Sequence, residues 1–322
     1  MAKATYWAAT DAETRKRGEQ TGLDTLVNEK VFKVSLNGNF SCPNRDGKIS
    51  TNGCIFCSAS GSGDFAGNIN LSIKDQFYEV ASILGKKWPN GAYIAYFQAN
   101  TNTYGTVSEL KQRYEQIIKD GKKLDDKIKI LSIATRPDCL DNDVLNLLKE
   151  LNNQIPLWIE LGFQTSNEET AKYINRGYSN DILVKAVKDL KSLGITVIVH
   201  IINGLPTDTH SDMIDTIKFL RKLPIDGIKI HMLHVINNSP LGKLYKEYPF
   251  PLLTMEEYVK IVVEQLRLLP PNIVIHRITG DADKNELLAP MWTLKKFVVM
   301  NEIDKLMRSK NYYQGDLYVQ DC

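Results

Sequence analysis

Residues 156–202 read PLWIELGFQTSNEETAKYINRGYSNDILVKAVKDLKSLGITVIVHII, and this stretch decides the fold class. It begins and ends with short apolar, partly β-branched runs, at 156–163 and 195–202. Amphipathic segments at 168–174 and 181–193 lie between them, and Gly194 follows as a helix stop. Two strands separated by helices on this scale cannot form a hairpin, so the pattern predicts a β–α–β unit with parallel strands.

The same alternation recurs on both sides of this stretch. Further strand-like runs lie at 31–36, 92–97, 128–135 and 227–236, with amphipathic segments at 73–84, 108–120, 141–151 and 210–223. Six such units predict an α/β fold, a partial (β/α)6 barrel of the TIM type with parallel strands. We expect an N-terminal extension over 1–30, the barrel over 31–236, and a C-terminal α+β segment over 237–322 with a strand near 273–278.

The composition is that of a globular protein with a sizeable core. The chain has 322 residues, of which 43% are hydrophobic and 24% charged, with a net charge of +2. This balance excludes a strongly basic nucleic-acid coat but leaves room for a local basic face. No run approaches the ~18 apolar residues of a membrane span, and the first residues lack an apolar signal region, so we expect a cytoplasmic protein without a membrane partner.

Three of the five cysteines are clustered directly after the first predicted strand. They form the string Cys42-PNRDGKISTNG-Cys54-IF-Cys57, a C-x11-C-x2-C arrangement in a loop-forming context. Three thiolates can bind three irons of a cubane cluster and leave the fourth iron open. A structural zinc site would need a fourth ligand, and the loop contains no histidine that could be that ligand. Zinc and three unrelated core cysteines remain the alternatives at this point.

This loop, placed at the start of a six-unit βα chain, resembles the radical S-adenosylmethionine (SAM) superfamily. The commonest spacing there is C-x3-C-x2-C, and the wider first gap resembles the branch that contains the Elongator catalytic subunit. The resemblance implies one [4Fe–4S] cluster on Cys42, Cys54 and Cys57, with SAM at the open iron. It also implies a flavodoxin- or ferredoxin-type electron donor and places Phe56 near the adenine of SAM.

Further SAM contacts are implied by the same resemblance. Gln98, Asn100 and Thr101 stand where the family usually carries the Gly-Gly-Glu that binds the SAM amino group. The segment from Glu160 to Arg176 resembles an E-L-G-x-Q-[ST]…R-G pattern, in which Glu160 accepts from the ribose and Gln164 and Arg176 bind the SAM carboxylate. The turn of Gly204, Leu205 and Pro206 resembles a motif at the adenine side.

Three residues are candidates for relaying the radical or a proton. Cys139 lies in TRPDC after the third predicted strand, where side chains face the mouth of a barrel. His231 and His234 lie on the sixth predicted strand, and strict alternation puts them on opposite faces. For each of the three, a purely structural role is the alternative.

The C-terminal motifs extend the resemblance to the YhcC/YtqA-type radical SAM proteins. This implies action on the anticodon region of tRNA, where the C5 side chain of wobble uridine U34 is converted from carboxymethylaminomethyl to aminomethyl. Aromatic contacts are then expected from Tyr104, Tyr178 and Trp292, and phosphate contacts from Lys295, Lys296, Lys305, Arg308 and Lys310. A radical SAM enzyme for a small metabolite is the alternative, and a non-catalytic iron–sulfur module is a third reading.

Overall fold

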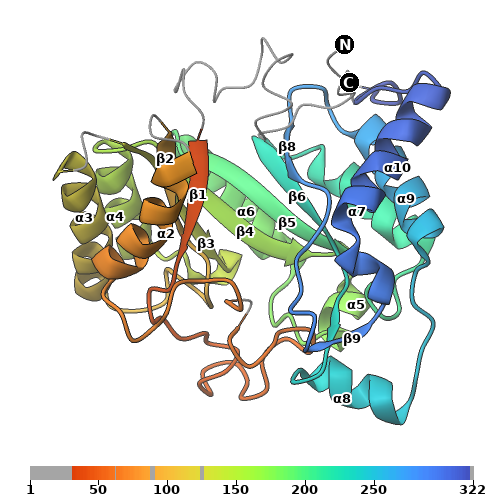
Figure 1. Ribbon diagram of the computed structural model, residues 1–322, viewed down its shortest axis with the longest axis horizontal. Coiled ribbons are helices and arrows are strands. Elements are labelled where there is room, and N and C mark those ends of the chain that lie inside the picture. Colours follow the sequence, from red (N-terminus) through yellow and green to blue (C-terminus); the bar gives the residue numbers. More distant parts are fainter. Residues whose placement is uncertain (1–30, 62, 88–90, 124–126, 320–322) are drawn as a thin grey trace.

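The computed structural model describes residues 31–61, 63–87, 91–123 and 127–319, so the predicted N-terminal extension lies outside the described residues. Its centre is one curled, entirely parallel sheet of seven strands in the order β1-β2-β3-β4-β5-β6-β8 (Figure 1). The strands are β1 (Val31–Leu36), β2 (Ala92–Phe97), β3 (Ile128–Thr135), β4 (Leu157–Gln164), β5 (Thr196–Asn203), β6 (Gly227–Met232) and β8 (Val274–Arg277). The predicted partial barrel with parallel strands is confirmed.

Helices cover the outer face of this sheet. In Figure 1, α2, α3 and α4 lie on one side of the curl and α7, α9 and α10 on the other. The helices are α2 (Ile73–Lys87), α3 (Val107–Lys123), α4 (Asn142–Asn152), α5 (Glu168–Tyr173), α6 (Asn180–Ser192), α7 (His210–Leu220), α8 (Pro240–Glu247), α9 (Met255–Leu268) and α10 (Lys296–Ser309). None of these helices is both long enough and apolar enough to cross a membrane.

The C-terminal segment extends the barrel instead of standing beside it. Strand β8 pairs in parallel with β6, which makes seven strands where the sequence predicted six. Helix α9 packs against α7 and α10, and so continues the outer helical layer. The predicted strand at 227–236 is interrupted, because β6 ends at Met232 and the short β7 (Val235–Ile236) pairs with β9 (Leu287–Ala289) in a separate antiparallel ribbon.

Side-chain alternation along the strands divides the interior into two parts. On β4, Leu157, Ile159 and Leu161 point outward into the main hydrophobic core beneath the helices. Trp158 points inward and belongs to a small apolar cluster that fills one end of the barrel interior. The other members of that cluster are Val31, Ile94, Ile130 and Ile198. The opposite end of the interior, at the carboxyl ends of the strands, is not filled by this cluster and can hold a site.

Candidate active site

The three clustered cysteines lie on the loop 37–72, which joins β1 to α2 at the carboxyl ends of the strands (Figure 1). The carbonyl oxygen of Cys42 accepts from the amide of Arg45 at 2.8 Å, and that of Cys54 accepts from the amide of Cys57 at 3.1 Å. Backbone turns therefore set the direction of the thiols. All three cysteines line one cavity.

Buried Asn44 ties this loop to the segment after α5. Its side-chain nitrogen donates to the carbonyl oxygen of Asn175 at 2.6 Å and to the sulfur of Cys54 at 3.4 Å. A hydrogen bond from Cys57, together with the nearby guanidinium of Arg136, lowers the pKa of Cys54 to about 7. The same contact with Cys54, together with burial, raises the pKa of Cys57. One thiol of the pair is thus set up to ionise first.

The donor set fits an iron–sulfur cluster better than a single metal ion. Within the described ranges, no three His, Cys, Asp or Glu side chains are grouped so that they could hold one ion. A cubane cluster has a different requirement, because each thiolate binds a different iron. Arg45 and Arg136 also line the cavity, and their positive charge suits an anionic thiolate cluster. Cys42, Cys54 and Cys57 would hold a [4Fe–4S] cluster here.

The cavity has a volume of about 790 Å³ and extends from the cysteines into the barrel. This volume lies in the upper part of the usual range for ligand pockets. Besides the three cysteines, the sequence-predicted residues that line it are Phe56, Gln98, Asn100, Thr101, Glu160, Gln164, His231 and His234. The structure therefore brings together most of the predicted site.

The wall after β2 is docked on the cysteine loop. The amide of Asn100 donates to the carbonyl oxygen of Gly61 at 2.9 Å, and the amide of Thr101 donates to that of Ser41 at 3.2 Å. Gly61 has a φ of +64°, and a Cβ there would lie 1.8 Å from the Asn100 side-chain oxygen. The close approach therefore requires glycine, and it holds Asn100 beside the cluster loop.

Glu160 lies at the floor of the cavity in a dense charged network. Its Oε1 accepts from Lys33 Nζ at 2.6 Å and from Ser132 Oγ at 2.7 Å. Its Oε2 accepts from His200 Nε2 at 2.8 Å and from Lys229 Nζ. The carboxylate is fully buried, and Lys229 and Lys33 lower its pKa against the opposing effect of burial. Since both oxygens are already occupied, the ribose contact expected of Glu160 has little acceptor capacity left.

The two candidate histidines both line the cavity, contrary to the expectation of opposite faces. Strict alternation fails because β6 ends at Met232, so His234 follows the strand and is turned back toward the cavity. Burial lowers the pKa of His231 and lowers that of His234 to about 4. Both rings are therefore neutral at physiological pH.

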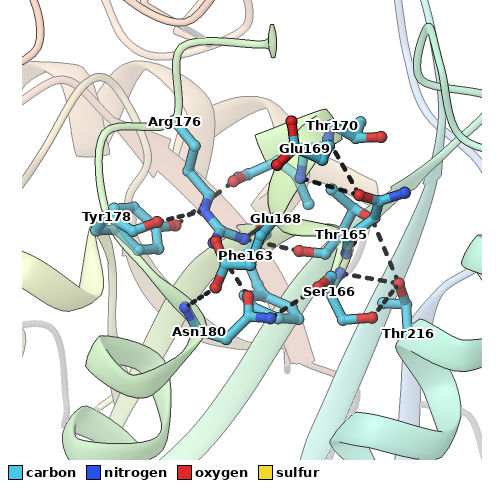
Figure 2. Close-up of polar contacts among 12 residues, drawn as sticks. Phe163, Thr165, Ser166, Glu168, Glu169, Thr170, Arg176, Tyr178, Asn180 and Thr216 are labelled. Atoms are coloured by element: carbon cyan, nitrogen blue, oxygen red, sulfur yellow. Dashed lines mark hydrogen bonds and ion pairs between the residues drawn. The ribbon is translucent and has the colours of Figure 1, made fainter. Parts of the chain in front are cut away.

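Arg176 is held by protein groups, as Figure 2 shows. Its Nε donates to the carbonyl oxygen of Tyr178 at 2.9 Å, and Nη1 donates to those of Phe163 and Thr165 at 3.1 and 2.7 Å. Its Nη2 donates to Glu168 at 3.2 Å and to Asn180 at 3.0 Å. All five guanidinium donors are occupied, and the residue does not line the cavity. This geometry speaks against the predicted SAM-carboxylate contact and assigns Arg176 to organising the β4–α5–α6 connection.

The turn of Gly204, Leu205 and Pro206 also lies outside the cavity lining. Leu205 is buried in a second apolar cluster with Leu233 and Val235, so this turn packs the C-terminal segment against the barrel. A direct adenine contact is not what this packing indicates.

Cys139 does not line the cavity either. Burial raises the pKa of its thiol to about 12, and its carbonyl oxygen accepts from Thr103 Oγ1 at 2.7 Å. The structure thus favours the structural alternative for Cys139.

Sequence reasoning missed the partners of Glu160. Lys33, Lys229 and His200 lie within apolar strands, and all three line the cavity. The sequence did contain a signal for these partners, because a lysine inside a buried parallel strand needs an opposite charge nearby.

The curled parallel sheet, with three cysteines on the loop after its first strand, defines a radical SAM enzyme fold. Residues 47–220 match the family model described as the radical SAM superfamily, and residues 225–309 match that of the radical SAM C-terminal domain. The chain belongs to the radical SAM superfamily.

Individual relatives and one solved structure are similar to this chain. The chain is 45% identical to the protein YtqA of Bacillus subtilis, over 90% of this chain and 88% of that protein. It is 26% identical to the tRNA uridine(34) acetyltransferase of Methanocaldococcus infernus, over 54% of this chain and 34% of that protein. The fold is similar to the solved structure of Methanocaldococcus infernus Elp3 with an N-terminal deletion, with a TM-score of 0.68 and 17% identity over 89% of this chain and 64% of that chain.

Proposed function

We propose that this radical SAM enzyme acts on tRNA and converts the carboxymethylaminomethyl group at C5 of wobble uridine U34 to aminomethyl. The bond between the amine nitrogen and the carboxymethyl carbon breaks, and the two-carbon unit leaves as glyoxylate. That carbon is oxidised by two electrons and takes its new oxygen from water, while SAM is the oxidant and is reduced to methionine and 5′-deoxyadenosine. The observation that carries the proposal is the single cavity of about 790 Å³ that joins the cysteine loop to a polar floor inside the barrel. SAM and a substrate group can share such a space. The similarity to a relative named as a tRNA uridine(34) acetyltransferase supports a nucleoside substrate.

Cys42, Cys54 and Cys57 would hold a [4Fe–4S] cluster, which when reduced would supply the electron for cleavage of SAM and so the chemistry of hydrogen abstraction from carbon. The chain's own residues bind and orient. Under this proposal, Phe56 contacts the adenine, and Gln164 contributes to holding the SAM carboxylate. Gln98, Asn100 and Thr101 hold the SAM amino group through side-chain oxygens. Arg136 lines the cavity near the cysteines and is paired with Asp138 through Nε at 2.9 Å and Nη2 at 2.7 Å. Its Nη1 is directed to neither of these oxygens, and we propose that it replaces Arg176 as the donor to the SAM carboxylate.

The substrate base has to leave its stack to reach the cavity, as bases do in enzymes that modify them. Of the three aromatics expected to contact the base, Tyr178 lines the cavity, whereas Tyr104 and Trp292 do not. The Trp292 indole donates to the carbonyl oxygen of Leu253 at 2.8 Å and packs on Tyr258, so it supports the fold. Tyr178 is therefore the aromatic side chain that we propose to contact the base.

A basic strip at α10 would hold the phosphates of the anticodon stem. Lys296 lines the cavity but is paired with Asp281 at 2.6 Å, and Lys305 lies 3.6 Å from Glu302. These partners reduce the net field of the helix, so phosphate binding through α10 would compete with existing ion pairs. Lys295 is exposed and lies at the N-terminal end of α10.

The deciding experiment uses reconstituted enzyme, reductant, SAM and tRNA that carries carboxymethylaminomethyl at U34. We expect aminomethyluridine in the digested tRNA, and more 5′-deoxyadenosine than in the control without tRNA. Neutralising Lys295, Lys296, Lys305 and Arg308 together should weaken tRNA binding and flatten its salt dependence. A control matched in charge neutralises four exposed lysines on α4, α5 and α6, namely Lys149, Lys172, Lys185 and Lys188.

An unchanged U34 nucleoside, with 5′-deoxyadenosine at the control level, would reject the tRNA assignment. A small-metabolite substrate would then be the better reading of the same cavity. The reductant is expected to be a flavodoxin or ferredoxin, and each can replace the chemical reductant in this assay.

A further inference from the structure

The floor of the cavity is the charged network of Lys33, Glu160, His200 and Lys229, which line it, together with Ser132, which donates to Glu160. It lies in the middle of the barrel. Lys33 is the third residue of β1, and the cysteine loop starts after Leu36. At ~3.3 Å per residue, the floor is about 10 Å below the end of that strand. The floor is thus deeper in the barrel than the loop that would hold the cluster and SAM. The far end of a substrate would lie at this depth.

The charged floor is not needed to close the barrel. The layer beneath it is apolar and contains Ile94, Ile130, Trp158 and Ile198, all buried. Ile94 and Trp158 of this layer also line the cavity, so apolar side chains are enough to close it beneath the charged layer. A charged layer above an apolar one, facing a cavity, indicates a ligand-binding role because burying these charges is costly.

The floor has N–H donors to spare, whereas its one carboxylate is fully used. Each oxygen of Glu160 already has two partners, so the carboxylate anchors the network. Lys33 has three N–H donors and gives one to Glu160, and its side chain is 27% exposed. The Lys33 ammonium lies 4.3 Å from the ring centroid of Tyr96, which fixes its position at the cavity wall.

The balance of charge also favours an anion. Two lysines share one carboxylate, and the neighbouring imidazole of His200 is neutral because burial lowers its pKa to about 4. Burial lowers the pKa of Lys229, and a nearby anion would favour its protonated form. A cationic substrate group placed here would instead be repelled by the ammonium groups of Lys33 and Lys229.

We propose that Lys33, supported by Lys229 on the Glu160 anchor, binds the carboxylate of the substrate side chain and selects acidic substituents over neutral ones. This rests on the proposed function, in which the substituent on U34 ends in a carboxymethyl group. The carboxylate then points to the floor, and the carbons next to the amine lie between the floor and the SAM site. Lys33 is a specificity-determining residue in this arrangement.

The test compares two substrates on two enzymes. The substrates are tRNA with carboxymethylaminomethyl at U34 and the same tRNA with the neutral carboxamide. The enzymes are the unaltered protein and Lys33→Met, which keeps the apolar stem but removes the charge. Lys188→Met on the exposed face of α6 is the matched control. Iron content and melting temperature report whether each variant is intact.

The unaltered enzyme should prefer the acid over the amide roughly ten- to hundredfold in kcat/KM, the size of one charge-assisted contact. Lys33→Met should lower kcat/KM for the acid and bring the two substrates within about threefold of each other. Equal losses on both substrates would overturn the proposal, as would a variant with an unchanged preference. A raised Kd for SAM with an unchanged preference would also overturn it, by assigning Lys33 to SAM.

The acid-to-amide comparison on the unaltered enzyme gives a result even if the variant fails to hold iron, because equal turnover of both would refute carboxylate selection. If the unaltered enzyme converts neither tRNA, the proposed function itself fails, and the carboxylate proposal that rests on it fails too. Conversion without acid preference rejects only the role of the floor.

Discussion

Replacing Arg176 by alanine should damage the fold far more than it damages SAM recognition. The side chain is fully buried, and its five N–H donors go to three backbone carbonyls, Glu168 and Asn180 (Figure 2). Alanine leaves those carbonyls without this donor. At about 1 kcal/mol per net hydrogen bond, the three carbonyls alone amount to about 3 kcal/mol. Glu168 is half exposed, so its ion pair adds little.

The assay is thermal unfolding followed by near- and far-UV circular dichroism, with SAM binding measured in parallel on the reconstituted enzyme. A loss of about 3 kcal/mol corresponds to a melting temperature lower by roughly 4–5 °C for a chain of 322 residues. Lys172→Ala on the exposed side of α5 is the control and should stay within about 0.5 kcal/mol. Arg176→Lys should restore only a small part, because an ammonium cannot reproduce the planar fork.

The opposite pattern would refute this reasoning. A melting temperature within about 2 °C of the unaltered protein, together with a SAM affinity lowered tenfold or more, would make Arg176 a ligand contact after all. The hydrogen bonds in Figure 2 would then describe a state that changes when SAM binds.

Two other predictions concern the cluster and pH. Alanine at any one of Cys42, Cys54 and Cys57 should lower the iron content after anaerobic reconstitution below about four per chain and should abolish SAM cleavage. Cys139→Ala should keep both the iron and the cleavage, and a full iron content in any of the three variants would contradict the assignment. Burial raises the pKa of Asp208 to about 6, and its Oδ2 has no partner, so the folded state favours the protonated acid. The stability contribution of Asp208 is therefore greatest below pH 3.8 and is lost as the pH rises through about 6. Asp208→Asn should accordingly stabilise the protein at about pH 7.5, with a gain that shrinks between about pH 6 and 4, and a gain independent of pH in denaturation curves would count against this pKa.

Local pattern was enough to predict the barrel and the three cysteines that line one cavity. The strands are readable because a parallel sheet is covered on the outside by helices, so β-branched runs and amphipathic stretches alternate along the chain. The cysteines are readable because three of them lie within sixteen positions on one loop, close enough for their thiolates to share a cluster. Phe56, Gln98, Asn100 and Thr101 follow from the same logic, since they stand on or beside the loops at the strand ends and do line the cavity.

Other residues depended on partners far away in the sequence. Arg176 resembles a ligand contact in the linear motif, but three carbonyls in the β4–α5–α6 connection use its donors in the folded chain. The end of β6 at Met232 decides which way His234 faces. The pairing of β8 with β6 decides how many strands the sheet contains.

The floor shows this most clearly. Lys33, Ser132, Glu160 and Lys229 come from four different strands, and they meet only because inward-facing positions of a curled sheet converge on its axis. A sequence pattern specifies which face of a strand is buried, because that depends on a period of two residues. It does not specify which charge on another strand lies opposite, because that depends on sheet register and curvature. The sequence alone therefore determined the class of chemistry, while the tertiary structure decided which charged side chains lie at the floor of the cavity.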